Sequence, residues 1–202
     1  MTDVFTGEIC GIGSAGGVRV VIGRWPVSPF GPVADAMVED AAGRRTFVAA
    51  DAALAAYVTS IYSFDDVVVA AIDCARSAGR LHFRGGPLHV DVAIGRRDPL
   101  GWMLRAVPRR VAVHARWLSF TDVVARHVLR GVRTIGETPG GRELYAATDR
   151  HRVTAIRGSW HGADLGALGD VEPPVRFGFS STPRRPSIVA ITTLVERTPE
   201  RT

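Results

Sequence analysis

The chain of 202 residues contains no lysine, no asparagine and no glutamine, so arginine supplies all 25 of its basic side chains. Without lysine, the protein cannot form a Schiff base, hold pyridoxal phosphate as an aldimine or use a Walker-type phosphate loop. Without asparagine, a Cys-His-Asn protease site and N-glycosylation are also excluded. Abundant Ala, Gly, Val and Arg accompany these absences, and this bias is typical of a GC-rich genome.

Cysteine is scarce, and long apolar runs are missing. Cys10 and Cys74 are isolated in apolar stretches, which favours two buried free thiols in a reducing cytoplasm over a disulfide or a metal pair. The longest apolar run, near residues 67–72, is too short to cross a bilayer. The first ten residues have neither a basic start nor an apolar core, so we expect no secretory signal and a cytoplasmic location.

Charge and composition set further limits. The net charge of +5 comes from scattered arginines and is poor evidence for nucleic acid, so we expect no specific nucleic-acid partner. With 46% apolar and 22% charged residues, the composition is typical of a globular protein. The length suits a single domain over residues 1–202.

Residues 7–17, GEICGIGSAGG, contain Gly11, Gly13 and Gly16 in the spacing of the dinucleotide-binding fingerprint. That fingerprint requires a helix after the glycines, whereas the next residues are the β-branched stretch VRVVI, and Pro26 soon follows. The glycines therefore predict the turn of a β-hairpin, and we expect no dinucleotide at this site.

Short strands with period-2 alternation predominate at both ends of the sequence, and hairpin turns join them. Three helices are predicted, at 51–64 with Asp51 as its cap, at 98–107 and at 119–131. The predicted fold class is α+β and β-dominated: an antiparallel barrel or curled sheet of about ten to twelve strands with about three helices.

The stretch RLHFRGGPLHVDVAIG predicts a well-defined hairpin with a two-residue loop at Gly85 and Gly86. We also expect one buried strand over 66–74, a turn at Asp149 that separates two strands, and a strand over 174–179. The hairpin register predicts these cross-strand pairs: Phe83 with Leu88, Leu81 with Val90, His82 with His89, and Arg80 with Asp91.

His89 and Asp91 resemble the HxD half of the facial triad of non-haem iron oxygenases, because residues i and i+2 of a strand point the same way. With six His and 20 acidic residues in the chain, such a pair arises readily by chance, so we expect a solvated face, no bound metal and no cofactor. The remaining members of such a site would be His82 on the same face, His151 or His161 as a distal ligand, and Arg157 or Arg176 as a carboxylate clamp.

Two further segments carry chemistry-bearing side chains. In SWHGADLG, His161 with Asp164 could be an oriented general base and thus a catalytic pair, or Asp164 could simply cap a tight turn, the interpretation we favour. The segment 96–133 carries nine Arg and only two acidic residues, together with two Trp. It could bind a membrane surface or another polyanion, although packed helices with solvated arginines are the simpler interpretation.

Two resemblances to known proteins follow from short motifs. The stretches GRWPVSPFGP and PPVRFGFSSTPRRPS resemble actinobacterial proteins of about this length, a resemblance that implies no activity. Gly23-Arg24-Trp25 is similar to the GxW motif of lipocalins, and Thr148-Asp149 is similar to the TD strand turn of that family. The lipocalin resemblance implies a single eight-stranded barrel that holds an apolar small molecule, with Trp25 at the barrel floor.

We therefore predict a domain that binds a small apolar or weakly acidic molecule inside a β-barrel. A metal- or His-dependent enzyme that uses His82, His89 and Asp91, or His161 and Asp164, is an alternative, as is a polyanion binder that uses segment 96–133. Neither the ligand nor the oligomeric state follows from the sequence. The predicted ligand-binding residues are Trp25, Phe83, Tyr145 and Trp160, with Arg157 or Arg176 to orient an acidic group.

Overall fold

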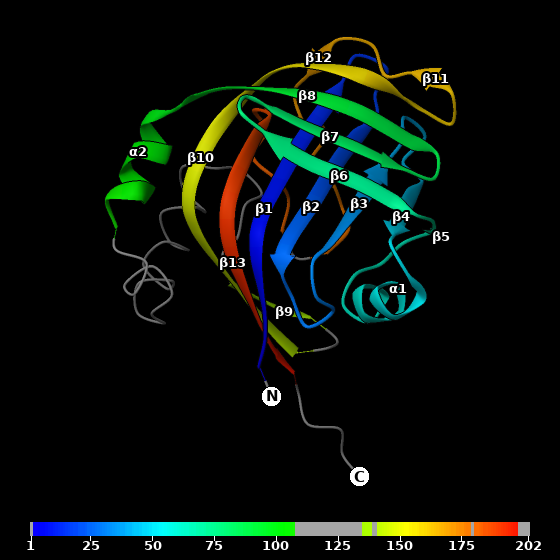
Figure 1. The fold of residues 1–202 in the computed structure, drawn as a ribbon. Coiled ribbons are helices and arrows are strands. Elements are labelled where there is room, and N and C mark those ends of the chain that lie inside the picture. Colours follow the sequence, from blue (N-terminus) through cyan, green and yellow to red (C-terminus); the bar gives the residue numbers. More distant parts are fainter. Residues whose placement is uncertain (1, 108–134, 139–140, 179, 198–202) are drawn as a thin grey trace.

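The computed structural model describes residues 2–107, 135–138, 141–178 and 180–197 (Figure 1). Within these residues, 13 strands form one sheet in the order β5-β4-β3-β2-β1-β13-β10-β8-β7-β6, with β9 and β11 paired to β10 and β12 paired to β1. A β-dominated α+β fold with a curled sheet is thus confirmed, and two of its strands, β11 and β12, have only two residues each. The helix predicted at 119–131 lies outside the described residues.

The described residues contain two helices and 13 strands. The helices are α1 (Ala52–Thr59) and α2 (Pro99–Ala106). The strands are β1 (Thr2–Ser14), β2 (Arg19–Val27), β3 (Val33–Glu39), β4 (Arg45–Ala49), β5 (Asp66–Val69), β6 (Ile72–Ser77), β7 (Arg80–Gly85), β8 (Leu88–Arg97), β9 (Ile135–Thr138), β10 (Gly141–Trp160), β11 (Ala163–Asp164), β12 (Leu168–Gly169) and β13 (Ser187–Arg197).

The glycine-rich N-terminal segment forms the predicted hairpin. β1 and β2 pair antiparallel up to Gly13 and Arg19, and Gly17 turns the chain with φ +79°. A side chain rarely adopts that φ, which explains why glycine stands there. The Val18 N–H donates to the Ser14 hydroxyl oxygen at 3.1 Å, which closes the turn. The chain from Arg19 to Val27 is a strand rather than a helix.

The predicted helix after Asp51 forms but is shorter than expected. The Asp51 carboxylate accepts from the Leu54 N–H at 2.8 Å, and α1 ends at Thr59. Because this helix carries the chain back across the sheet edge, β5 pairs parallel to β4. The prediction of one buried strand over 66–74 is wrong, since β5 and β6 are separate strands and Val67 and Val69 are 46% and 52% exposed.

The β7–β8 hairpin has the predicted buried face but a different register. Its two-residue loop is Gly86-Pro87, because Gly85 pairs with Leu88. Proline lacks an N–H and suits a loop position better than a paired one, and Gly86 supplies the positive φ of +50° that the turn needs. The register shifts by two residues, which gives these pairs: Phe83 with Val90, Leu81 with Val92, His82 with Asp91, Arg84 with His89, and Arg80 with Ala93.

Two other local predictions are wrong. No turn separates two strands at Asp149, since β10 runs through this position with a bulge between Ala147 and Asp149. The Asp149 carboxylate accepts instead from Arg97, at 2.6 and 2.8 Å. Residues 174–178 form no strand, because the Arg176 N–H donates to the Glu39 carboxylate at 3.0 Å rather than to a neighbouring strand.

Two layers cover opposite faces of β1–β4. β8, β7 and β6 cross in front of β1, β2 and β3 (Figure 1), and β6 contacts β3. We call the covered side, which carries Cys10, Ile22 and Val38, the inner face; it packs against Phe83 and Trp160. The opposite side is the outer face. None of the helices in the described residues is long and apolar enough to span a membrane.

The outer face has a second apolar core. Phe5, Trp25 and Phe47 on this face pack against α1. Val21 and Met37 pack against the irregular segment that follows β12, through Val171, Val175 and Phe177. The sheet is therefore buried on both sides.

Candidate functional site

Three charged side chains meet at one end of the inner face. Glu8 of β1 alternates with Cys10 and Ile12, which are both buried there, so its side chain shares that face. Arg24 of β2 lies directly opposite Glu8 in the strand pairing, and its Nη1 is 3.6 Å from Glu8 Oε2. Arg76 reaches Glu8 from β6, with Nε 3.5 Å from Oε1. We call Glu8, Arg24 and Arg76 the inner arginine cluster.

The contacts within the inner arginine cluster are ion pairs without hydrogen bonds. Glu8 Oε2 and Arg76 Nε are both buried atoms that have no hydrogen-bond partner. Arg24 makes its ion pair and donates no hydrogen bond to any residue that the structure describes. Arg76 Nη1 donates to the backbone oxygens of Ser77 and Arg80 instead. The side chains of Glu8, Arg24 and Arg76 are 25%, 32% and 23% exposed, so solvent reaches the cluster.

Both cysteines lie next to this cluster and are free thiols, as predicted, although Cys74 is only partly buried. Cys10 follows Glu8 on the inner face, and Cys74 precedes Arg76 on β6. Burial, with a smaller effect of the Glu8 charge, raises the pKa of Cys10 to about 12. Burial also raises the pKa of Cys74 to about 11. Because both pKa values are raised, neither thiol is activated as a thiolate. Cys10 and Cys74 extend the apolar inner core to the edge of the inner arginine cluster.

The four aromatic residues that we predicted to line a ligand site lie on two faces of the sheet. Phe83 and Trp160 belong to the inner core, where Phe83 is fully buried. Trp25 belongs to the outer core, and Tyr145 packs against it. The structure therefore places Phe83 and Trp160 in one apolar core, and Trp25 and Tyr145 in the other.

On the outer face, Trp25 is paired with a buried carboxyl group. Its indole Nε1 donates to Asp35 Oδ2 at 2.9 Å. Desolvation raises the pKa of Asp35 to about 7, although the indole hydrogen bond lowers it. The close approach requires glycine beneath it, because a Cβ at Gly23 would lie 2.5 Å from Trp25 Nε1.

Tyr145 belongs to a second polar group on the outer face. The hydroxyl oxygens of Tyr62 and Tyr145 lie 2.6 and 2.7 Å from Glu143 Oε2, and 2.5 Å from each other. Glu143 is 1% exposed, and burial raises its pKa although both hydroxyl groups lower it. Burial also raises the pKa values of both tyrosines well above the usual range.

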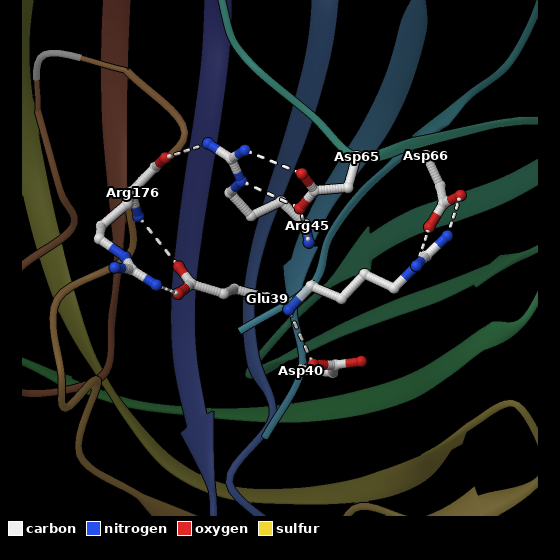
Figure 2. Close-up of polar contacts among 7 residues, drawn as sticks. Glu39, Asp40, Arg45, Asp65, Asp66 and Arg176 are labelled. Atoms are coloured by element: carbon white, nitrogen blue, oxygen red, sulfur yellow. Dashed lines mark hydrogen bonds and ion pairs between the residues drawn. The ribbon is translucent and has the colours of Figure 1, made fainter. Parts of the chain in front are cut away.

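Arg176, a predicted ligand-binding residue, pairs with a buried acid near the edge of the sheet (Figure 2). Glu39 is fully buried, and its Oε1 lies 3.2 Å from both Arg176 Nη2 and Arg19 Nη2. Arg45 donates to the Arg176 carbonyl at 3.3 Å and holds Asp65 through two hydrogen bonds of 3.1 and 2.9 Å. The Arg45 hydrogen bonds lower the pKa of Asp65 to about 2. This network holds the segment around Arg176 against β3 and β4.

The predicted histidine residues do not form one site, although His82 and Asp91 lie opposite each other in the β7–β8 pairing. His82 Nε2 lies 3.3 Å from Asp73 Oδ2, whereas His89 is exposed opposite Arg84. Among the residues that the structure describes, no group of three or more His, Cys, Asp or Glu side chains could hold a metal ion. His151 lies near Asp149, with Nε2 3.6 Å from Oδ2.

The His161–Asp164 pair occupies the turn after β10. Asp164 Oδ1 accepts from the Gly166 N–H at 3.0 Å, as a turn-capping carboxylate does. His161 is exposed and has φ +49°, and its ring lies edge-on to Trp160 with centroids 4.6 Å apart. Arg157 is exposed on β10, opposite Asp91.

Segment 96–133 is described only as far as residue 107. Its first helix is capped as predicted, because Asp98 accepts from the Gly101 N–H at 2.9 Å. Trp102 and Met103 are 61% and 55% exposed, and the Arg97 guanidinium carbon lies 4.5 Å from the Trp102 ring centroid. The remainder of the Arg-rich segment lies outside the described residues.

The inner arginine cluster was not predicted from the sequence, although the position of Glu8 opposite Arg24 could have been inferred. A hairpin turn at residues 14–18 places Glu8 opposite Arg24, since the pairing of Gly13 with Arg19 fixes that register. The signal in the sequence was Glu8, a charged residue at a position that alternates with the buried Cys10 and Ile12. The approach of Arg76 depends on how β6 folds over β1, which no local pattern reveals.

No protein-family model matches the sequence, and no curated protein matches it. Among solved structures, the fold is similar to the crystal structure of acetoacetate decarboxylase from Legionella pneumophila subsp. pneumophila str. Philadelphia 1, with a TM-score of 0.45 and 9% sequence identity. The match covers 97% of this chain and 85% of that chain. A likeness at this level implies no activity for this chain.

Proposed function

We propose that the protein binds a small carboxylic acid with an apolar body at the inner arginine cluster. The main observation behind the proposal is that Arg24 and Arg76, from two layers of the sheet, both form ion pairs with the carboxylate of Glu8. Neither arginine donates a hydrogen bond to that carboxylate. A cluster of two guanidinium groups and one carboxylate has an excess of positive charge and of N–H donors. A second carboxylate would supply the missing negative charge.

Arginine is suited to this role. Each guanidinium group presents five N–H donors in a planar fork that matches a carboxylate, and such charge-assisted hydrogen bonds are about twice as strong as neutral ones. Arg76 uses only Nη1 for backbone oxygens. Donors of both arginines therefore remain for a ligand, and the partial exposure of the side chains gives a ligand access to them.

The neighbours of the cluster favour an apolar body on the ligand. Cys10 and Ile22 follow Glu8 and Arg24 inward along β1 and β2, and both are fully buried. Leu81 pairs with Arg76 across the β6–β7 hairpin and is 1% exposed. Since these side chains are fully buried, the apolar body of a ligand whose carboxylate lies between the arginines would contact Cys74, which is only partly buried and precedes Arg76 on β6.

The proposal can be tested by isothermal titration calorimetry at neutral pH with benzoate and its neutral isostere benzamide. We expect saturable binding of benzoate and at least about tenfold weaker binding of benzamide, because a hydrogen bond to a charged group contributes about 1.5–3 kcal/mol. Arg24→Met and Arg76→Met should each weaken benzoate binding by a similar factor. Arg152→Met is the matched control, because that side chain is exposed on β10 and belongs to no predicted site.

Several outcomes would contradict the proposal. They are the absence of saturable benzoate binding, equal affinity for benzamide, or an equal loss of affinity in the Arg152→Met variant. Circular dichroism of each variant establishes that the sheet is intact before binding is compared.

A further inference from the structure

We propose that Tyr62, Glu143 and Tyr145 form a proton-dependent latch, in which a neutral Glu143 carboxyl group holds the connection between α1 and β5 against β10. This inference is independent of the proposed ligand site, since the latch lies on the outer face and the inner arginine cluster on the inner one. We call residues 60–65, which follow α1, the latch segment.

The geometry of the three oxygen atoms determines how many protons the latch contains. Tyr62 and Tyr145 hydroxyl oxygens and Glu143 Oε2 form a triangle with edges of 2.5, 2.6 and 2.7 Å. Every edge is of hydrogen-bond length, so three protons are needed to occupy the three edges. Two phenols supply two protons, and the third must reside on Glu143.

An ionised Glu143 does not fit this arrangement. Both phenols would then donate to the carboxylate, and their oxygen atoms would face each other at 2.5 Å without a proton between them. Lone-pair repulsion would drive the two hydroxyl groups apart. With a neutral carboxyl group, each oxygen donates once and accepts once around the ring, which removes the repulsion.

The surroundings favour the neutral form. Glu143 is 1% exposed, and its cross-strand partner on β13 is the buried Val195. Asp3 lies beyond Val195 on β1, and its carboxylate accepts from the Tyr57 hydroxyl of α1 at 3.0 Å. The other charged side chains near the latch segment already have partners: Asp65 with Arg45, and Arg176 with Glu39. Desolvation is accordingly the largest influence on the Glu143 pKa, and it raises that pKa.

The latch connects parts of the chain that are far apart in sequence. Tyr62 comes from the latch segment and Glu143 from β10, 81 residues later. A Cβ at Gly178 would lie 2.5 Å from the Tyr62 ring, so the segment that follows β12 packs directly on Tyr62. Phe64 and Phe177 continue this contact, with ring centroids 5.7 Å apart. Opening of the latch would therefore loosen both covering segments of the outer face.

The sign of the pH dependence follows from the raised pKa. Glu143 binds its proton more tightly in the closed latch than when it is exposed to solvent. Below the ordinary carboxyl pKa of about 4.3 it is protonated in both forms, so pH does not change the stability of the closed form there. As the pH rises from there to the raised pKa, the closed form loses stability. The equilibrium constant for opening should increase by up to about tenfold per pH unit in that window.

Hydrogen exchange monitored by mass spectrometry over a pH series, corrected for intrinsic exchange rates, tests the proposal. In the wild type, protection of the latch segment and of residues 171–178 should fall with rising pH by more than protection of β7 and β8, which follows the change in global stability. Glu143→Gln should remove this additional pH dependence of the latch segment, because the amide is neutral at every pH and can still donate and accept. Tyr62→Phe should lower protection at every pH, because it removes two edges of the ring.

Infrared spectroscopy supplies an independent measurement of the proton. A neutral-carboxyl carbonyl band that is present at pH 6 in the wild type and missing in Glu143→Gln would support the proposal. Protection that does not vary with pH in the wild type would overturn it. An equal pH dependence in the wild type and in Glu143→Gln would also overturn it, even if Tyr62→Phe does not fold.

Discussion

Asp35 is a buried carboxyl group whose main partner is the indole N–H of Trp25, and this environment makes it costly to ionise. Its pKa of about 7 in the folded protein lies above the ordinary value near 3.9. Asp35 therefore does not change the free energy of unfolding with pH while the pH is below about 3.9. It lowers the free energy of unfolding as the pH rises from there through about 7. Asp35→Asn, which keeps an oxygen acceptor for the indole, should remove the loss.

Urea unfolding at pH 5 and pH 8 measures this effect. We expect Asp35→Asn to be more stable than the wild type at pH 8 by an amount on the order of a few kcal/mol, and the two to differ less at pH 5. Asp73→Asn is the control, since the Asp73 side chain is 74% exposed. A wild-type pH slope that persists unchanged in Asp35→Asn would show that Asp35 does not ionise with the raised pKa.

Individual residues also show where prediction from sequence ends. Trp25 was predicted from the sequence to line a ligand site, but its partner Asp35 lies ten positions away and becomes a neighbour only through the β2–β3 pairing. Arg176 was predicted to orient an acidic group of a ligand, yet the acid that holds it, Glu39, is 137 positions away. Such pairs are set by tertiary packing, which local patterns do not encode.

At the scale of elements, the cap of α1 gives a direct test. The helix has only eight residues, and Asp51 satisfies the Leu54 N–H at its start. Asp51→Ala should lower the free energy of unfolding by about 0.5–2 kcal/mol, whereas Asp51→Asn, an equally good cap, should change it little. Equal losses in the two variants, measured by urea unfolding, would mean that the cap is not the cause.

Elements with a strong local signal were predictable, and those fixed by pairing were not. The β1–β2 hairpin and the caps at Asp51 and Asp98 follow from turn residues and from side chains that bond their own backbone. The division of 66–74 into β5 and β6 depends on parallel pairing with β4 across α1. The position of the β7–β8 loop depends on Pro87. Because proline has no N–H to donate within the sheet, it occupies the loop, although two adjacent glycines favour a loop one residue earlier.

At the scale of the whole molecule, the curled sheet has two different polar sites on its two faces. The inner face carries an excess of positive charge at its partly exposed end, which suits an anion. The outer face carries buried carboxyl groups with raised pKa values under α1 and the segment after β12. The two faces should therefore respond to different variables, the inner one to carboxylate ligands and the outer one to pH.

The central claim, a carboxylate site between Arg24 and Arg76, is tested most directly by a crystal structure of the protein with benzoate. We predict that the benzoate carboxylate lies within hydrogen-bond distance, about 2.7–3.2 Å, of both guanidinium groups, with its ring toward the partly buried Cys74. Benzoate bound elsewhere, or contacting neither arginine at saturating concentration, would contradict the account.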